Sequence, residues 1–76
     1  NMNSERLIKI VMMELASDQM KLEDELEKTI NSDMEINVKL ISIKSLLSQM
    51  TAIDASIAKF TSMTNNNKNN NNNNTD

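Results

Sequence analysis

The 76-residue sequence has no glycine, proline, cysteine, histidine, tryptophan or tyrosine, and Phe60 is its one aromatic residue. Average proteins contain about 7% Gly and about 5% Pro, so roughly nine of these residues would be expected in a chain of this length. Hairpin turns of strands and phosphate-binding loops depend on glycine or proline. Their absence argues against a strand-rich fold and predicts an all-α protein.

The lack of histidine and cysteine limits the chemistry that the chain can perform. It removes the usual zinc ligands, the imidazole base and the thiol nucleophile. The remaining carboxylates, lysines and hydroxyls have no evident activating group in the sequence. We therefore expect no catalytic, cofactor-binding or metal site, and no enzymatic activity.

Charge and hydropathy restrict the possible partners. Eight basic and eleven acidic residues give a net charge of -3, the wrong sign for binding nucleic-acid phosphates or an anionic membrane. The longest apolar run, Ile10 to Met13, is far shorter than the roughly 20 residues that span a membrane. The sequence predicts a soluble protein without direct nucleic-acid or membrane contacts. The absence of cysteine is typical of a reducing, intracellular compartment.

Composition changes abruptly near residue 64. All 29 hydrophobic residues lie between Met2 and Met63, whereas residues 64–76 include nine asparagines and no apolar side chain. Such a tract cannot bury apolar area to offset its conformational entropy. We expect a helical module over residues 1–63 and a disordered tail over 64–76. The Asn tract and the opening Asn1 suggest a piece of a larger protein.

A cluster of weak helix formers predicts a break in the helical body. Ser32 and Glu35 form a capping-box pattern, and Asn31 is suited to a left-handed helix C-terminus. The sequence thus favours a two-helix antiparallel hairpin that associates into a helical bundle. The expected elements are a helix over residues 4–30, a turn at 31–32 and a helix over 33–62.

One long coiled-coil helix is the alternative. Residues from Ile8 to Ile57 repeat at seven-residue spacing through the supposed break, as in a continuous coiled coil. A strand around Met34 to Leu40 is disfavoured, because its alternation fails at Leu40 and Ile41.

The apolar residues outnumber what one hairpin can cover. The chain has 25 large apolar residues, whereas a single seam at two sevenths of each helix would use about 16. A two-helix unit without metals or disulfides is also below the size of a self-sufficient core. We expect the chain to form a homotetramer or dimer with itself as partner. The predicted oligomer interface comprises Leu7, Ile8, Val11, Met12, Leu15, Leu22, Leu26, Ile36, Leu40, Ile43, Leu46, Leu47, Met50, Ile53, Ile57 and Phe60.

Polar residues among the apolar columns have two interpretations. Gln19 fits an outer edge position, and the alternative is a central polar layer that specifies bundle register. Asp54 fits an exposed rim, and the alternative is a contact with Lys59 or a role in fixing orientation. The acidic run at residues 23–27 is expected to be a solvated helix face rather than a docking strip.

The segments Ile8 to Ile30 and Ile36 to Phe60, followed by an Asn tract, resemble the C-terminal oligomerisation domain of budding-yeast telomere regulators of the Rap-one-interacting factor family. The resemblance covers residues 4–63 and rests on composition and helical pattern. It implies a nuclear, chromatin-associated scaffold that links DNA-bound repressor-activator proteins. The rival hypothesis is a helical subunit of a hetero-oligomeric assembly, such as a kinetochore or tethering complex.

Overall fold

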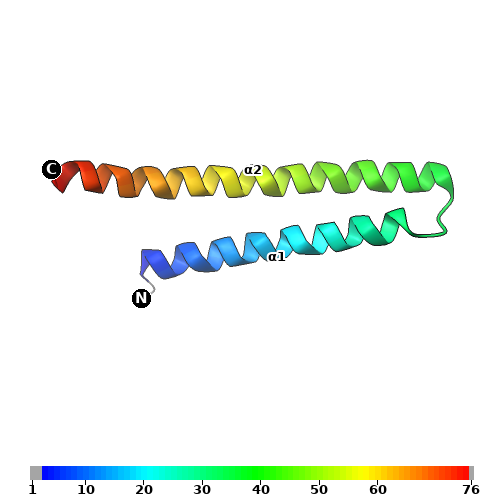
Figure 1. Cartoon of the computed structure of the whole chain (residues 1–76), viewed down its shortest axis with the longest axis horizontal. Helices are drawn as coiled ribbons and strands as arrows, with labels where there is room; N and C mark the ends of the chain where they lie inside the picture. Colours follow the sequence, from blue (N-terminus) through cyan, green and yellow to red (C-terminus); the bar gives the residue numbers. More distant parts are fainter. Residues whose placement is uncertain (1–2, 76) are drawn as a thin grey trace.

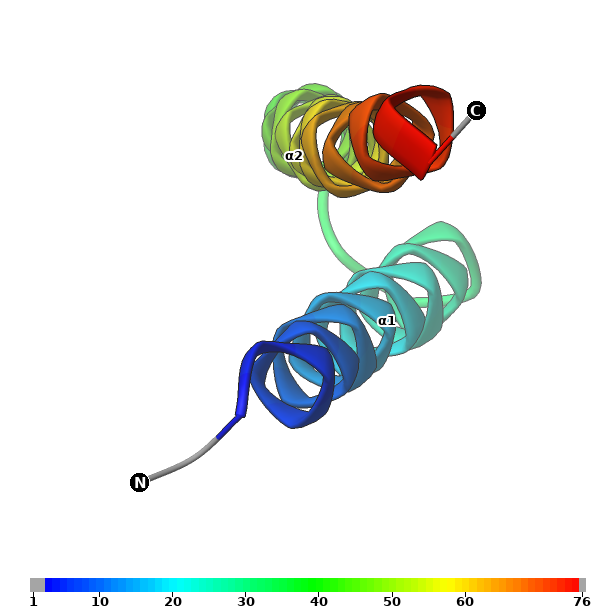
Figure 2. The same ribbon diagram turned by 90° about the vertical axis from the view of Figure 1, so that its left-hand side faces the viewer.

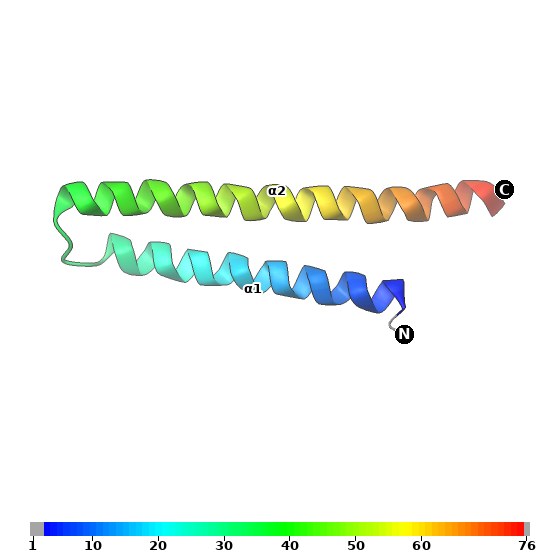
Figure 3. The same ribbon diagram turned by 180° about the vertical axis from the view of Figure 1, so that it is seen from behind.

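The computed structural model describes the backbone of residues 3–75 and the side chains of residues 3–65. Two helices, α1 (Ser4–Ile30) and α2 (Ile36–Thr75), run antiparallel and pack against each other as a hairpin (Figures 1 and 3). The predicted hairpin is confirmed, and the alternative of one continuous helix is wrong. Residues 3–75 contain no strand.

The first helix has the predicted bounds. The side chain of Asn3 accepts a hydrogen bond from the backbone N–H of Arg6 at 2.8 Å, which satisfies one of the free donors at the helix start. Lys28 lies in the last turn, where a cation complements the helix dipole. Both ends of α1 therefore carry favourable local interactions.

The prediction of a left-handed Asn31 is wrong. Its φ of -91° and ψ of 3° lie outside the left-handed region, and no residue in the described backbone has positive φ. The Asn31 side chain instead donates from Nδ2 to the carbonyl of Glu27 at 3.0 Å. A side-chain donor thus satisfies a terminal carbonyl of α1 without a backbone reversal.

The predicted capping box at Ser32 is also wrong, because α2 begins three residues later than expected. The Ser32 hydroxyl donates to the carbonyl of Thr29 at 2.7 Å and so belongs to the end of α1. The carboxylate of Glu35 caps α2, since its Oε2 accepts from the N–H groups of Asn37 and Val38 at 3.0 and 3.2 Å. A carboxylate also complements the positive end of the helix dipole.

Lys39 closes the connection between the helices. Its ammonium Nζ donates to the carbonyl of Ser32 at 3.0 Å, and the side chain is half-buried. The connection over residues 31–35 is thereby held at both ends, by Ser32 against α1 and by Lys39 from the first turn of α2.

The second helix is longer than expected. It continues to Thr75 and extends past the N-terminal end of α1 (Figure 1). At about 1.5 Å per residue, its 40 residues account for the 61 Å long axis of the molecule. The structure differs here from the predicted helix end at residue 62 and the disordered tail over 64–76, of which residue 76 lies outside the described residues.

The physical reason for this difference is that nothing in the tract blocks a helical backbone. Asparagine costs less than about 1 kcal/mol relative to alanine in a helix, and an existing helix gains one hydrogen bond for each residue added. The division of the chain into a module and a tail stays a prediction.

The hairpin has a single layer of packing. In Figure 2, which looks along the molecule, α1 and α2 lie side by side, and no third element covers them within residues 3–75. Among the described side chains, Leu46 and Thr29 are the buried residues, and each is 8% exposed. Thr29 donates from its hydroxyl to the carbonyl of Glu25 at 2.8 Å, so its burial leaves no polar atom unpaired.

The Glu35→Ala substitution should destabilise the chain by about 0.5–2 kcal/mol, the usual range for loss of a helix N-cap. The reason is that two N–H groups of α2 lose their acceptor. Urea unfolding followed by circular dichroism measures the change. The control is Asp33→Ala, which removes an equal charge from the same connection. Equal effects of the two substitutions would contradict the capping role.

Candidate protein-interaction surface

Twelve of the predicted interface residues lie in the seam, by which we mean the surface where α1 and α2 pack against each other. Leu46 is buried and the other eleven are half-buried, so they cover one another within the chain. Their contact with a second chain stays a prediction. The twelve are Ile8, Val11, Met12, Leu15, Leu22, Leu26, Ile43, Leu46, Met50, Ile53, Ile57 and Phe60.

The other four predicted residues remain exposed on the hairpin. Leu7 lies in the first turn of α1, and the other three lie in the first half of α2. Further apolar side chains that the prediction did not include are exposed as well. Within the described part of the chain, eleven large apolar residues are between 39% and 71% exposed, namely Leu7, Met13, Met20, Ile30, Met34, Ile36, Val38, Leu40, Ile41, Leu47 and Met63.

One broad face of the hairpin carries a polar pair that joins the two helices. Gln19 Nε2 donates to Asp54 Oδ1 at 2.8 Å. This contact pairs Asp54 with α1 rather than with Lys59. The role of Gln19 in specifying bundle register stays a prediction. On the same face, the hydroxyl of Thr61 lies 4.0 Å from the sulfur of Met12.

These contacts define two columns of residues. Met12 and Gln19 are seven residues apart on α1, as are Asp54 and Thr61 on α2, and a step of seven returns to nearly the same side of a helix. Continuing both columns toward the connection gives Leu26 on α1 and two leucines on α2. We call this the Gln19 face, and it comprises Met12, Gln19, Leu26, Leu40, Leu47, Asp54 and Thr61.

The half of the Gln19 face nearest the connection is apolar. Leu40 and Leu47 are each 48% exposed. Leu26 is half-buried and lies level with Leu47 in the register set by the contact between Gln19 and Asp54. Ile36 precedes Leu40 by four residues and Ile30 follows Leu26 by four, so both extend the patch by one helical turn. The face thus has an exposed apolar half that ends at the polar pair of Gln19 and Asp54.

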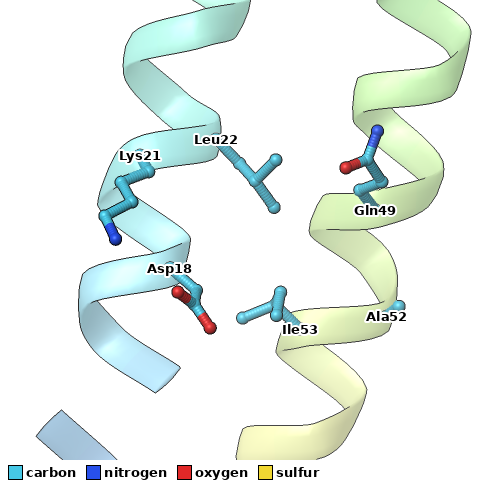
Figure 4. A pocket seen from close by; sticks show the side chains of 6 residues that line it. All are labelled: Asp18, Lys21, Leu22, Gln49, Ala52 and Ile53. Atoms are coloured by element: carbon cyan, nitrogen blue, oxygen red, sulfur yellow. The ribbon is translucent and has the colours of Figure 1, made fainter. Parts of the chain in front are cut away.

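The opposite face of the hairpin contains a shallow hollow (Figure 4). Its lining combines apolar and charged groups from both helices, and Leu22 and Ile53 point into the space between them. Asp18 points toward Ile53, whereas the side chain of Lys21 runs away from α2. Gln49 donates to the carbonyl of Ser45 on its own helix at 3.4 Å.

The two helices carry opposite net charge. Seven acidic and four basic residues give α1 a net charge of -3, whereas residues 36–63 of α2 contain one acidic and three basic residues, a net charge of +2. The acidic run at residues 23–27 contributes to this asymmetry, and its acidic side chains are exposed. A helix that packs on the outside of α1 is therefore favoured if it is basic.

Within the described residues, no group of three or more acidic side chains is placed to hold a metal ion. A search of the described helices also finds no segment long and apolar enough to cross a membrane. Comparison with known proteins finds no matching family model, curated protein or solved structure. The surface itself is therefore the basis for inferring function.

The Leu46→Ala substitution should lower the free energy of unfolding by about 2–5 kcal/mol, because it removes the best-buried apolar side chain of the seam. Ile41→Ala on the same helix is the matched control, because Ile41 is 69% exposed and should change stability by about 0.5 kcal/mol or less. Chemical unfolding of the full chain measures both. A cost for Ile41→Ala as large as that for Leu46→Ala would contradict the described packing.

Proposed function

We propose that this chain is a self-association module, in which hairpins pack together into a homodimeric or homotetrameric helical bundle. One observation carries the proposal: among the side chains of residues 3–65, eleven large apolar residues are exposed and one, Leu46, is buried. On the Gln19 face, Leu40 and Leu47 lie in one column with Ile36 one turn away. An exposed apolar patch of this kind on a monomer is typical of a binding site. A core this small also needs association to become stable, because the chain has no disulfide.

The role that follows is that of a non-enzymatic scaffold. A bundle of identical chains places several copies of any attached segment close together. Each further binding event then becomes intramolecular, so weak individual contacts gain strength through effective concentration. No catalytic group is required for this function.

The resemblance to the oligomerisation domain of telomere regulators extends the proposal to a cellular setting. It points to a nuclear scaffold that links DNA-bound repressor-activator proteins. Imaging of a fluorescent fusion tests this extension, because a cytoplasmic distribution would contradict it while leaving the self-association proposal intact.

Sedimentation equilibrium of the full chain tests the self-association proposal. The expected result is a discrete species of about 17 or about 34 kDa, two or four times the 8.6 kDa chain. The unfolding midpoint should rise with protein concentration, because mass action couples folding to assembly. A folded monomer at every concentration would reject the proposal and favour the rival hypothesis, docking on different chains.

A further inference from the structure

The pair of Gln19 and Asp54 has unused hydrogen-bonding capacity. The amide nitrogen of Gln19 carries two hydrogens, of which one is donated to Asp54 Oδ1. The Asp54 carboxylate has a second oxygen, Oδ2, that can accept a further hydrogen bond. As a unit, the pair offers one donor and two further acceptor oxygens, Asp54 Oδ2 and Gln19 Oε1, and is therefore complementary to a copy of itself.

We infer that a second copy of this chain packs on the Gln19 face with its two-fold axis parallel to the helices. This inference rests on the proposed self-association and specifies its geometry. Each Gln19 donates its second N–H to the carboxylate of Asp54 in the other copy. The two pairs thus close a ring of four hydrogen bonds at one level of a four-helix bundle.

Two-fold symmetry allows two ways of stacking hairpins through this face. If the axis runs parallel to the helices, α1 of one copy lies on α2 of the other, and both connections are at the same end; we call this parallel stacking. If the axis runs across the helices, α1 lies on α1 and the connections are at opposite ends; we call this antiparallel stacking. Only the parallel axis places each Gln19 opposite an Asp54, because the other axis pairs like residues.

The charges favour the same arrangement. With a parallel axis, each α1, with a net charge of -3, packs between two α2 helices whose residues 36–63 have a net charge of +2. With the other axis, two acidic helices face each other, and like charges at an interface oppose association. Helix charge and side-chain hydrogen bonding are separate contributions, and both favour the axis parallel to the helices.

The apolar half of the face explains what holds such a dimer together. In parallel stacking the connections of both copies lie at the same end. The leucines at 26, 40 and 47 from both copies therefore meet near that end. Nearly half of the Leu40 and Leu47 surface, exposed in the single hairpin, becomes covered. The apolar layers supply affinity, and the polar layer specifies register, as single polar layers do in coiled coils.

The first experiment measures orientation. The chain lacks cysteine, so Asp33→Cys in the exposed connection accepts a single nitroxide label, and pulsed electron resonance reports the distance between copies. Parallel stacking predicts a population within about 25 Å, given helix spacings of about 10 Å. Antiparallel stacking predicts about 40 Å, the length of α1. A dimer with only the long distance overturns this inference alone, whereas a monomer overturns the proposed function as well.

The second experiment tests the ring itself. Gln19→Ala should raise the dimer dissociation constant at least about tenfold, because it leaves two carboxylates unpaired in the interface. The double variant Gln19→Ala with Asp54→Ala should bind more tightly than the single variant, because it removes those carboxylates. In a free hairpin water solvates Asp54. Tighter binding by the double variant than by the single variant is therefore specific to a carboxylate that lies in the interface.

Gln49→Ala is the matched control, because it changes a glutamine on the opposite face and should leave the dissociation constant unchanged. Circular dichroism at each concentration separates loss of binding from loss of the hairpin. The ring is excluded if Gln19→Ala changes the dissociation constant by less than about twofold, since loss of a bond to a charged group costs more. It is equally excluded if the double variant binds more weakly than the single one.

Discussion

Two helices can cover each other along one side only, and this geometric limit governs the whole molecule. A lone pair of cylinders shares one seam, so each helix keeps most of its circumference in contact with water. The seam here encloses Leu46 and Thr29 and half-covers its remaining members. The apolar residues outside it, from Leu7 to Met63, cannot be buried by any rearrangement of the same hairpin. Their exposure is the basis of the proposed self-association.

The sequence predicted the helices better than their junction. Helical spacing and the absence of glycine and proline were sufficient to predict α1 and the hairpin, because these signals are averaged over many residues. The junction depends on competition among a few side chains for the same backbone groups. Ser32 and Glu35 were both identified, yet Ser32 caps the end of α1 and Glu35 alone caps α2. Composition likewise could not predict where α2 ends, because asparagine disfavours a helix only weakly.

The sequence predicted which apolar residues need to be covered, but not which of them are covered within the hairpin. The seven-residue columns identified residues that need a neighbour, and twelve of them have that neighbour within the chain. Spacing along one helix cannot show whether its own hairpin or another molecule provides the cover. The contact between Gln19 and Asp54 could not be derived at all, because it joins residues 35 apart and depends on the register that the connection sets. The side chains that hold the connection, those of Ser32, Glu35 and Lys39, carry no apolar signal.

The hairpin also gives the molecule a closed end and an open end. Residues 31–35 form the closed end, while Glu5 of α1 and Asn65 of α2 line one hollow at the other. Beyond that hollow, α2 continues alone. Any sequence joined to either terminus would therefore leave from the open end. A bundle with parallel hairpins would hold all its attached segments at the same end. Such an assembly brings the attached segments close together, whereas hairpins stacked in opposite directions would place them at both ends of a rod.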